Sequence, residues 1–223
     1  MNADALQGLI VSIQPPADSA LNNPDIVAAM AACAVANGAS GVRIEGVEHI
    51  AAVRKRLPNA PIVGLIKHVA QGFEPYITAS LADVERVLEA GATLVAADAT
   101  ARARSDASSF ADAVALMHRR GALAFADCAQ FDDARRALTA GADILATTLC
   151  GYTAETRGTP LPALSLVKSI ATLRAFTVCE GGVGSPADTA AAREAGADAV
   201  VVGTALTNLD VLVRRFAEAA RHA

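Results

Sequence analysis

The sequence is poor in the features that mark secreted, membrane-spanning and nucleic-acid-binding proteins. It has four cysteines in 223 residues, and none form a Cys-X-X-Cys pair, so we interpret them as reduced thiols of a cytoplasmic protein. No apolar run approaches the roughly 20 residues of a membrane-spanning helix, and the run at 8–13 is too short for a signal peptide. The formal net charge of −4 argues against general binding to nucleic acid or to a membrane surface. It leaves room for a small anionic ligand.

Linkers and metal-ligand clusters are also missing. No Pro-, Gly- or Ser-rich tract divides the chain, so we expect a single domain over residues 1–223. The histidines lack metal-ligand spacing, and no second ligand cluster supports a Mg²⁺ site at carboxylates. The histidines are His49, His68, His118 and His222.

What the sequence does have is a repeated join between a helix tail and an apolar run. Gly-Ala pairs stand at 38–39, 91–92, 141–142 and 196–197, roughly fifty residues apart, which is about the length of two βα units. Four such repeats make eight units, and eight βα units close into an α/β fold, the (β/α)8 TIM barrel. The active site of such a barrel lies at the C-terminal ends of the strands.

Eight apolar runs fit the buried strands of a parallel sheet. Capping residues mark several helix starts between them: Asn23, Ser80, Ser185, and Thr207 with Asp210 three residues on. The predicted strands cover residues 8–13, 41–44, 62–66, 93–97, 123–126, 143–146, 176–179 and 199–202.

The predicted strands carry or end in polar side chains or glycine. One such residue alone could be a solvated strand end, but a closed barrel directs all of them into one basin. The candidate site residues are Gln14, Arg43, Glu45, Lys67, Asp98, Asp127, Thr147, Thr148, Glu180 and Gly203.

Lys67 is the most informative of these residues because it emerges from a buried strand. Burial would destabilise its ammonium, so that a neutral Lys67 could act as a general base or form a Schiff base with a carbonyl substrate. Alternatively, Lys67 pairs with Asp98. Glu180 could orient a substrate, exchange a proton, or pair with Lys67 or Arg43.

Glycines after the last two strands indicate a phosphate site. The run 181–184 is Gly-Gly-Val-Gly before a helix start, and Gly203-Thr204 follows the eighth strand. Backbone N–H groups in such places bind anions, and barrels commonly hold phosphate here. The candidates are Gly181, Gly182, Gly203 and Thr204; the alternative is plain tight turns.

Taken together, the strand-end motifs resemble the N-acylglucosamine-6-phosphate 2-epimerase family, also called N-acetylmannosamine-6-phosphate 2-epimerases. The similarity runs from the first strand to the eighth, and TTLCGYT and the Ile-Lys strand end are its most specific parts. The motifs are LIVSIQ at 9–14, VRIEG at 42–46, IVGLIK at 62–67, DAT at 98–100, DC at 127–128, TTLCGYT at 147–153 and EG at 180–181.

The resemblance implies a cytoplasmic enzyme of sialic acid and amino-sugar catabolism. It would convert N-acetylmannosamine 6-phosphate to N-acetylglucosamine 6-phosphate by moving a proton at carbon 2, without cofactor or metal. The implied catalytic residues are Lys67 and Glu180. The implied substrate-binding residues are Gln14, Arg43, Asp127 and Thr148. Barrels of this kind often form dimers through helix faces, and the Ala-rich helices here permit a homodimer.

Two positions depart from the family pattern. His68 follows Lys67 where the family commonly has Arg, and Asn208 stands where it commonly has Arg near the phosphate. A guanidinium there makes a bidentate, charge-assisted contact, for which Arg102, Arg104 or Arg157 could substitute. Two rival hypotheses follow: a Schiff-base aldolase that uses Lys67, and a non-catalytic barrel that binds a sugar phosphate.

Overall fold

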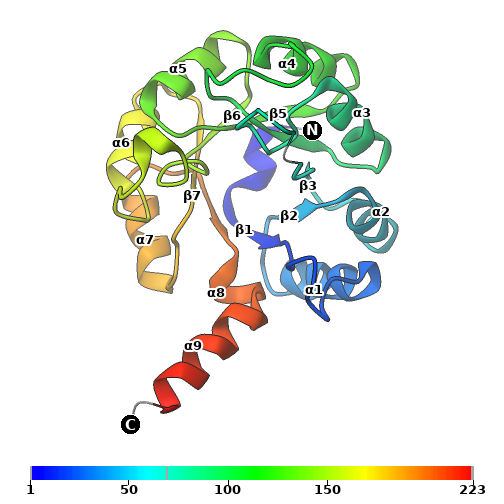
Figure 1. The fold of residues 1–223 in the computed structure, drawn as a ribbon, viewed down its shortest axis with the longest axis vertical. Helices are drawn as coiled ribbons and strands as arrows, with labels where there is room; N and C mark the ends of the chain where they lie inside the picture. The colour runs from blue at the N-terminus through cyan, green and yellow to red at the C-terminus, as the bar shows by residue number, and fades with distance from the viewer. Residues whose placement is uncertain (1, 69, 222–223) are drawn as a thin grey trace.

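The eight predicted strands form a closed parallel barrel, as Figure 1 shows for the computed structural model, which describes residues 2–68 and 70–221. Each strand pairs with the next in the chain, and β8 pairs with β1 through Gly8 opposite Ala199. The predicted barrel is therefore confirmed. The strands are β1 Gly8–Ile13, β2 Gly41–Glu45, β3 Ile62–Leu65, β4 Leu94–Asp98, β5 Leu123–Asp127, β6 Ile144–Ala146, β7 Phe176–Glu180 and β8 Ala199–Val202.

Helices surround the barrel, and three of them begin at predicted caps. Asn23, Ser80 and Ser185 each accept a hydrogen bond from a backbone N–H of the first helical turn, which satisfies an otherwise unpaired donor. The elements are η1 Ala3–Leu6, α1 Pro24–Ala36, α2 Val47–Arg56, α3 Leu81–Glu89, α4 Phe110–Arg119, α5 Phe131–Thr139, η2 Ala154–Thr156, α6 Leu164–Ala171, α7 Pro186–Glu194, α8 Thr204–Thr207 and α9 Leu209–Arg221. None of the described helices is long and apolar enough to cross a membrane.

The barrel interior is filled by alternate residues of the strands. Ile10, Leu94, Phe125 and Val178 point inward and are fully buried, and each such side chain contributes roughly 1.5–3 kcal/mol of transfer free energy. Because side chains alternate along a strand, the same inward register continues upward to the polar strand ends. Packing of the apolar layer thus fixes the direction of the polar layer above it.

The N-terminal end of the barrel is closed by η1. Leu6 is fully buried there, and a Cβ added to Gly41 would lie 2.6 Å from Leu6 Cδ2. Gly41 therefore lets the start of β2 approach this plug. With one end closed, access to the barrel interior comes from the opposite end.

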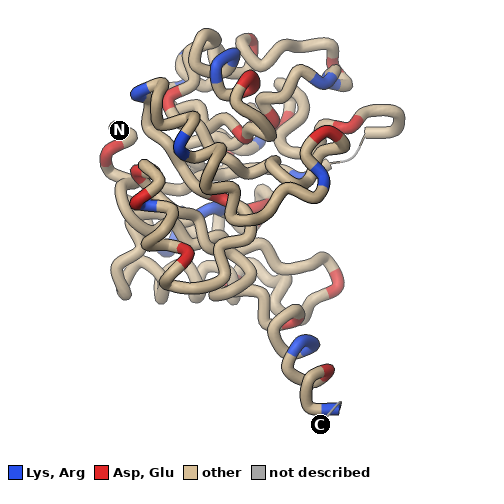
Figure 2. Tube along the Cα trace, turned by 90° about the vertical axis from the view of Figure 1, so that its left-hand side faces the viewer, with Lys and Arg blue, Asp and Glu red and all other residues tan. Residues whose placement is uncertain are grey.

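The C-terminal region differs from the prediction of one helix starting near Thr207. The chain first forms the short α8, in which the Thr207 hydroxyl donates to the carbonyls of Ser12 and Gly203. Asn208 then caps α9 by accepting from the Val211 N–H. Thr207 could not cap the helix because its hydroxyl is used to attach α8 to β1. Helix α9 extends away from the barrel in both views (Figures 1 and 2).

Candidate active site

A cavity of about 540 Å³ opens at the C-terminal ends of the strands. Its walls come from β1, β2, β7 and β8, from the loops after β3 and β6, and from α8 and α9. Ten residues were predicted to be catalytic, substrate-binding or phosphate-binding, and nine of them line the cavity: Gln14, Arg43, Lys67, Thr148, Glu180, Gly181, Gly182, Gly203 and Thr204. The strand-end candidates Glu45, Asp98 and Thr147 are absent from its lining. Asp127 lies behind this wall, fully buried and in contact with Arg43 and Thr148.

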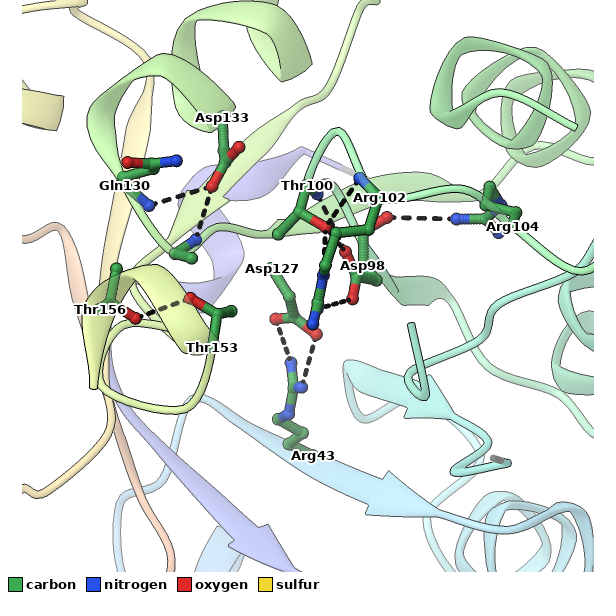
Figure 3. A network of polar contacts seen from close by, with 11 residues as sticks. Arg43, Asp98, Thr100, Arg102, Arg104, Asp127, Gln130, Asp133, Thr153 and Thr156 are labelled. Atoms are coloured by element: carbon green, nitrogen blue, oxygen red, sulfur yellow. Dashed lines mark hydrogen bonds and ion pairs between the residues drawn. The ribbon is translucent and has the colours of Figure 1, made fainter. Parts of the chain in front are cut away.

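Arg43 and Asp127 form a buried, bidentate ion pair beneath the cavity (Figure 3). Nη1 donates to Oδ1 at 3.1 Å and Nη2 donates to Oδ2 at 2.9 Å. The guanidinium also lies over the Phe125 ring, 5.2 Å from its centroid, at a cation–π distance. Burial acts to lower the pKa of Arg43, but the carboxylates of Asp127 and Glu180 outweigh it and raise the pKa. Arg43 is thus a fixed cation.

Glu180 is held by the two threonines that follow β6. Thr147 Oγ1 donates to the Glu180 carbonyl at 2.9 Å and accepts from the Glu180 N–H at 3.0 Å. Thr148 Oγ1 lies 3.0 Å from Glu180 Oε2 and 2.6 Å from Asp127 Oδ1. The Glu180 side chain is 13% exposed. Burial raises the pKa of Glu180, against the lowering influence of Arg43.

Lys67 follows β3 and pairs with Ile77 of the returning β3–α3 loop. Lys67 is exposed and lines the cavity. Desolvation there, together with the charge of Arg43, lowers the pKa of Lys67, although Glu180 and Glu45 oppose the shift. In an eight-stranded barrel β3 and β7 stand opposite each other. Lys67 and Glu180 therefore approach the cavity from opposite sides.

Asp98 is not the partner of Lys67. It pairs instead with Arg102, whose Nη2 donates to Oδ2 at 2.6 Å, and with the Thr100 hydroxyl (Figure 3). The reason is local, since the β4–α4 loop turns back and places a guanidinium over the end of its own strand. Glu45, for its part, accepts from the Lys67 backbone N–H at 3.4 Å.

The glycines that were predicted to bind phosphate have two different structural reasons. Gly182 has a φ of +72°, and a Cβ there would lie 2.4 Å from Leu161 Cβ, so the turn itself requires glycine. Gly203 has a φ of −110°, and its added Cβ would meet Ser12 Cβ at 3.4 Å. Glycine at 203 therefore chiefly leaves room in the cavity.

Gln14 supplies an unused acceptor to the cavity. Its Nε2 donates to Ser12 Oγ at 2.7 Å, whereas its buried Oε1 has no hydrogen-bond partner among the described residues. An acceptor in this state costs free energy until a donor reaches it. Gln14 can thus receive an N–H or O–H of a ligand.

Several residues of the cavity wall were not predicted as site residues from the sequence. Ser12, Tyr76 and Tyr152 join the wall, and so does Arg215 of α9. The arginines considered as substitutes for the one missing at 208 lie elsewhere: Arg102, Arg104 and Arg157 are absent from the lining. The signal for Arg215 was its helical spacing from Leu212 and from the cap residue Asn208, which places Leu212 and Arg215 on one face of α9.

Metal-ligating side chains do not gather in the described part of the chain. No group of three or more His, Cys, Asp and Glu residues there could hold an ion. His222 lies outside the described residues. The chemistry that this cavity can perform with its own side chains is proton transfer between an amine, a carboxyl group and a bound carbonyl compound.

Comparisons with known proteins identify the family of the chain. A family model described as "Putative N-acetylmannosamine-6-phosphate epimerase" matches residues 27–222. Two relatives carry the name "Putative N-acetylmannosamine-6-phosphate 2-epimerase". The one from Synechococcus elongatus is 42% identical over 215 residues, covering 95% of this chain and 93% of that protein. The one from Klebsiella pneumoniae is 46% identical over 204 residues, covering 91% and 85%.

Solved structures give the same result. The N-acetylmannosamine-6-phosphate 2-epimerase from Clostridium perfringens superposes with a TM-score of 0.92 at 30% identity, over 96% of this chain and 94% of that one. Deoxyribose phosphate aldolase from Aeropyrum pernix, at 21% identity and a TM-score of 0.66 over 93% and 90%, shares the fold alone. The chain belongs to the N-acetylmannosamine-6-phosphate 2-epimerase family.

Proposed function

We propose that this protein interconverts N-acetylmannosamine 6-phosphate and N-acetylglucosamine 6-phosphate, in the catabolism of sialic acid and amino sugars. One observation carries the proposal: an amine with a lowered pKa and a carboxyl with a raised pKa face one cavity from opposite sides. Groups whose pKa values are shifted in this way are suited to acid–base catalysis near neutral pH.

Lys67 is the proposed general base. In the open-chain sugar, carbon 2 lies next to the carbon 1 aldehyde, which makes its proton acidic. Neutral Lys67 takes that proton, the electron pair of the C–H bond forms an enolate, and the negative charge develops on the aldehyde oxygen. The lowered pKa of Lys67 increases the neutral fraction that this step needs.

Arg43 and Gln14 are the proposed substrate-binding groups at the reacting end. Arg43 is a permanent cation, already oriented by Asp127, and it stabilises the developing oxyanion without reorganisation. Gln14 Oε1 is an unpaired acceptor that suits the N–H of the acetamido group or a hydroxyl. Asp127 and Thr148 complete the set by positioning these groups.

Glu180 is the proposed proton donor on the second face. Inversion at carbon 2 requires the proton to return from the side opposite to its removal. Lys67 follows β3 and Glu180 ends β7, on opposite walls of the barrel. A protonated Glu180 returns a proton to carbon 2 as the enolate collapses to the aldehyde, and the reverse reaction exchanges the two roles.

Arg215 is the proposed cation of the phosphate end. The amides around Gly182 and Gly203 line this end together with Asn208 and Arg215. Asn208 is uncharged, and its side-chain oxygen is used to cap α9. We assign Gly181, Gly182, Gly203 and Thr204 to the phosphate through their backbone, and Arg215 through a charge-assisted contact.

The test is proton NMR of the protein with N-acetylmannosamine 6-phosphate in deuterated water. We expect N-acetylglucosamine 6-phosphate to appear with deuterium at carbon 2. A parallel incubation with substrate and borohydride distinguishes the epimerase from the Schiff-base aldolase. A Schiff base on Lys67 would be trapped as a stable adduct, whereas proton transfer leaves no adduct. Absence of conversion with an intact fold would refute the proposed function.

We also propose that the protein acts as a homodimer in the cytoplasm, with the whole chain as one domain. The four cysteines are free thiols, as in reducing compartments. Helix α9 has no buried residue, and Leu209, Val213 and Phe216 on its surface are 55%, 55% and 77% exposed. A second copy of the chain is the proposed cover of this apolar face.

A further inference from the structure

Thr148 lies between two carboxyl groups, and its contacts set a condition on their protons. Its Oγ1 is 2.6 Å from Asp127 Oδ1 and 3.0 Å from Glu180 Oε2. Both distances are those of hydrogen bonds between oxygens. A hydroxyl has a single hydrogen to donate. If both carboxyls were ionised, two acceptors would compete for it, so full satisfaction of both contacts requires another proton.

The neighbouring Thr147 cannot supply that proton. Its hydroxyl donates to the Glu180 carbonyl and accepts from the Glu180 N–H, so its hydrogen is already used on the backbone. The pair of threonines therefore divides two tasks. Thr147 fixes the main chain of Glu180, and Thr148 contacts its side chain.

Arg43 indicates which carboxyl is ionised. Both terminal nitrogens of its guanidinium donate to Asp127, which is the bidentate geometry of a carboxylate. Arg43 Nε lies 3.2 Å from Glu180 Oε1, yet it has no hydrogen-bond partner among the described residues because the alignment is poor. The guanidinium is thus committed to Asp127, and the additional proton belongs to Glu180.

We infer that Thr148 is a positioning residue that holds Glu180 as a neutral acid. In this arrangement Glu180 Oε2–H donates to Thr148 Oγ1, and Thr148 Oγ1–H donates to the ionised Asp127, which is neutralised by Arg43. The catalytic role of this row of hydrogen bonds rests on the proposed function, because a neutral Glu180 is the form that returns a proton to carbon 2. Thr148 then acts through Glu180 and needs no contact with the sugar.

The charges that face Glu180 are compatible with this state. They come from Arg43 on β2, Lys67 after β3 and Asp127 on β5, while Tyr76 faces Asp127 and Arg43 from the β3–α3 loop. With Arg43 and Asp127 paired, the group carries no net charge when Glu180 and Lys67 are both neutral, and equally when Glu180 is ionised and Lys67 is protonated, so the contacts of Thr148 decide between the two states. Ionising Glu180 would put two carboxylates on the same hydroxyl.

The direct test is a carboxyl titration by NMR of protein labelled with ¹³C at the glutamate side chain, without substrate. The Glu180 signal is the one that disappears in Glu180→Gln. We expect it to show a neutral acid at neutral pH in the wild type and in Thr148→Ser, which keeps the hydroxyl. In Thr148→Val the neutral acid loses its acceptor, so the pKa of Glu180 falls toward its ordinary value.

The opposite result is equally clear. If Thr148 only donates to an ionised Glu180, then Thr148→Val raises the pKa of Glu180, and the inference is overturned. An ionised Glu180 in the wild type at neutral pH overturns it as well. Thr153→Val is the matched control, since Thr153 is buried in the same loop, contacts Thr156 and is absent from the cavity wall. It should leave the titration unchanged.

A second measurement relates the hydrogen bonds of Thr148 to turnover. The limb of the pH–rate profile that belongs to Glu180 should move to lower pH in Thr148→Val, stay in place in Thr148→Ser and be unaffected in Thr153→Val. A uniform fall in kcat without movement of that limb would mean a merely structural role. Because the NMR titration uses no substrate, its result stands even if the deuterium experiment refutes the proposed function.

Discussion

At the level of single residues, Lys67 is the group whose removal should cost most activity. A general base contributes about 10²–10⁴-fold to the rate, so Lys67→Ala should lower kcat by at least the lower figure. The measurement is the rate of deuterium incorporation at carbon 2. Lys168→Ala is the matched control, because Lys168 lies exposed on α6, away from the cavity, and it should keep wild-type turnover. A Lys67→Ala enzyme with normal turnover would contradict the assignment.

Replacing Glu180 should lower activity but raise stability. Because its pKa is raised in the folded state, the stability it contributes is complete below the ordinary Glu pKa of about 4.3 and is lost as pH rises through the folded pKa. Glu180→Gln cannot ionise, and its amide can donate to Thr148 as the acid does. We expect an inactive variant whose melting temperature exceeds that of the wild type by a margin that grows with pH.

The size of this effect follows from the shift. Each unit of pKa difference is worth about 1.4 kcal/mol, and for a chain of this length one kcal/mol moves the melting temperature by about 2–4 °C. Thermal melts of both proteins at acidic and mildly alkaline pH measure it. A variant that melts below the wild type at alkaline pH would show that Glu180 is stabilised as an anion.

Residue-scale prediction from sequence succeeded where a side chain continues the inward register of a strand. Lys67, Asp127 and Glu180 occupy such positions, two or more residues beyond a buried apolar neighbour of the same face. Prediction from sequence failed for the ion-pair partners of these strand-end residues. Asp98 pairs with Arg102 because a loop turns back on itself, and no periodic pattern encodes that turn.

At the level of elements, α9 should contribute to phosphate binding through Arg215. A hydrogen bond to a charged group is worth about 1.5–3 kcal/mol, so Arg215→Ala should raise KM for N-acetylmannosamine 6-phosphate by about tenfold or more. The measurement compares the phosphorylated and the unphosphorylated sugar, and only the former should lose affinity.

The chain offers a close control for this prediction. Arg214 is also an exposed arginine of α9 but is not part of the cavity wall. Arg214→Ala removes the same charge from the same helix and should leave KM almost unchanged. Equal effects of the two substitutions would mean that α9 acts through its general positive charge rather than through a contact of Arg215.

The boundary between α8 and α9 shows why elements at the chain end are harder to predict. The sequence around Thr207 and Asp210 fits a capping box. In the structure, however, the Asp210 carboxylate accepts a hydrogen bond from the Ser19 hydroxyl of the β1–α1 loop, and the Thr207 hydroxyl donates to the Ser12 carbonyl. Both side chains are taken by tertiary contacts. Asn208, which looked like a missing arginine, is the actual cap.

At the scale of the whole molecule, the Gly-Ala joins were sufficient to predict the barrel because each one marks the passage from a helix to a buried strand. The joins follow the odd-numbered helices α1, α3, α5 and α7, where a glycine with positive φ comes after the helix end, for example Gly91 and Gly196 with φ of +100° and +103°. Eight such units can close into a barrel when the strands tilt and their register is staggered. The repeat does not predict the position of the last helix, because no strand follows that helix.

That last helix leads to a prediction about assembly. Helix α9 covers 13 residues, none of them buried, and an isolated helix of about this length is marginally stable in water. We expect the protein to sediment as a dimer in which the apolar face of α9 is covered by a second copy. Phe216→Glu should shift the equilibrium toward monomer, because it places a charge where the 77% exposed ring would be desolvated. Phe73→Glu, the same change on an exposed loop ring, should leave the dimer intact. A wild type that sediments as a monomer at micromolar concentration would exclude this use of α9.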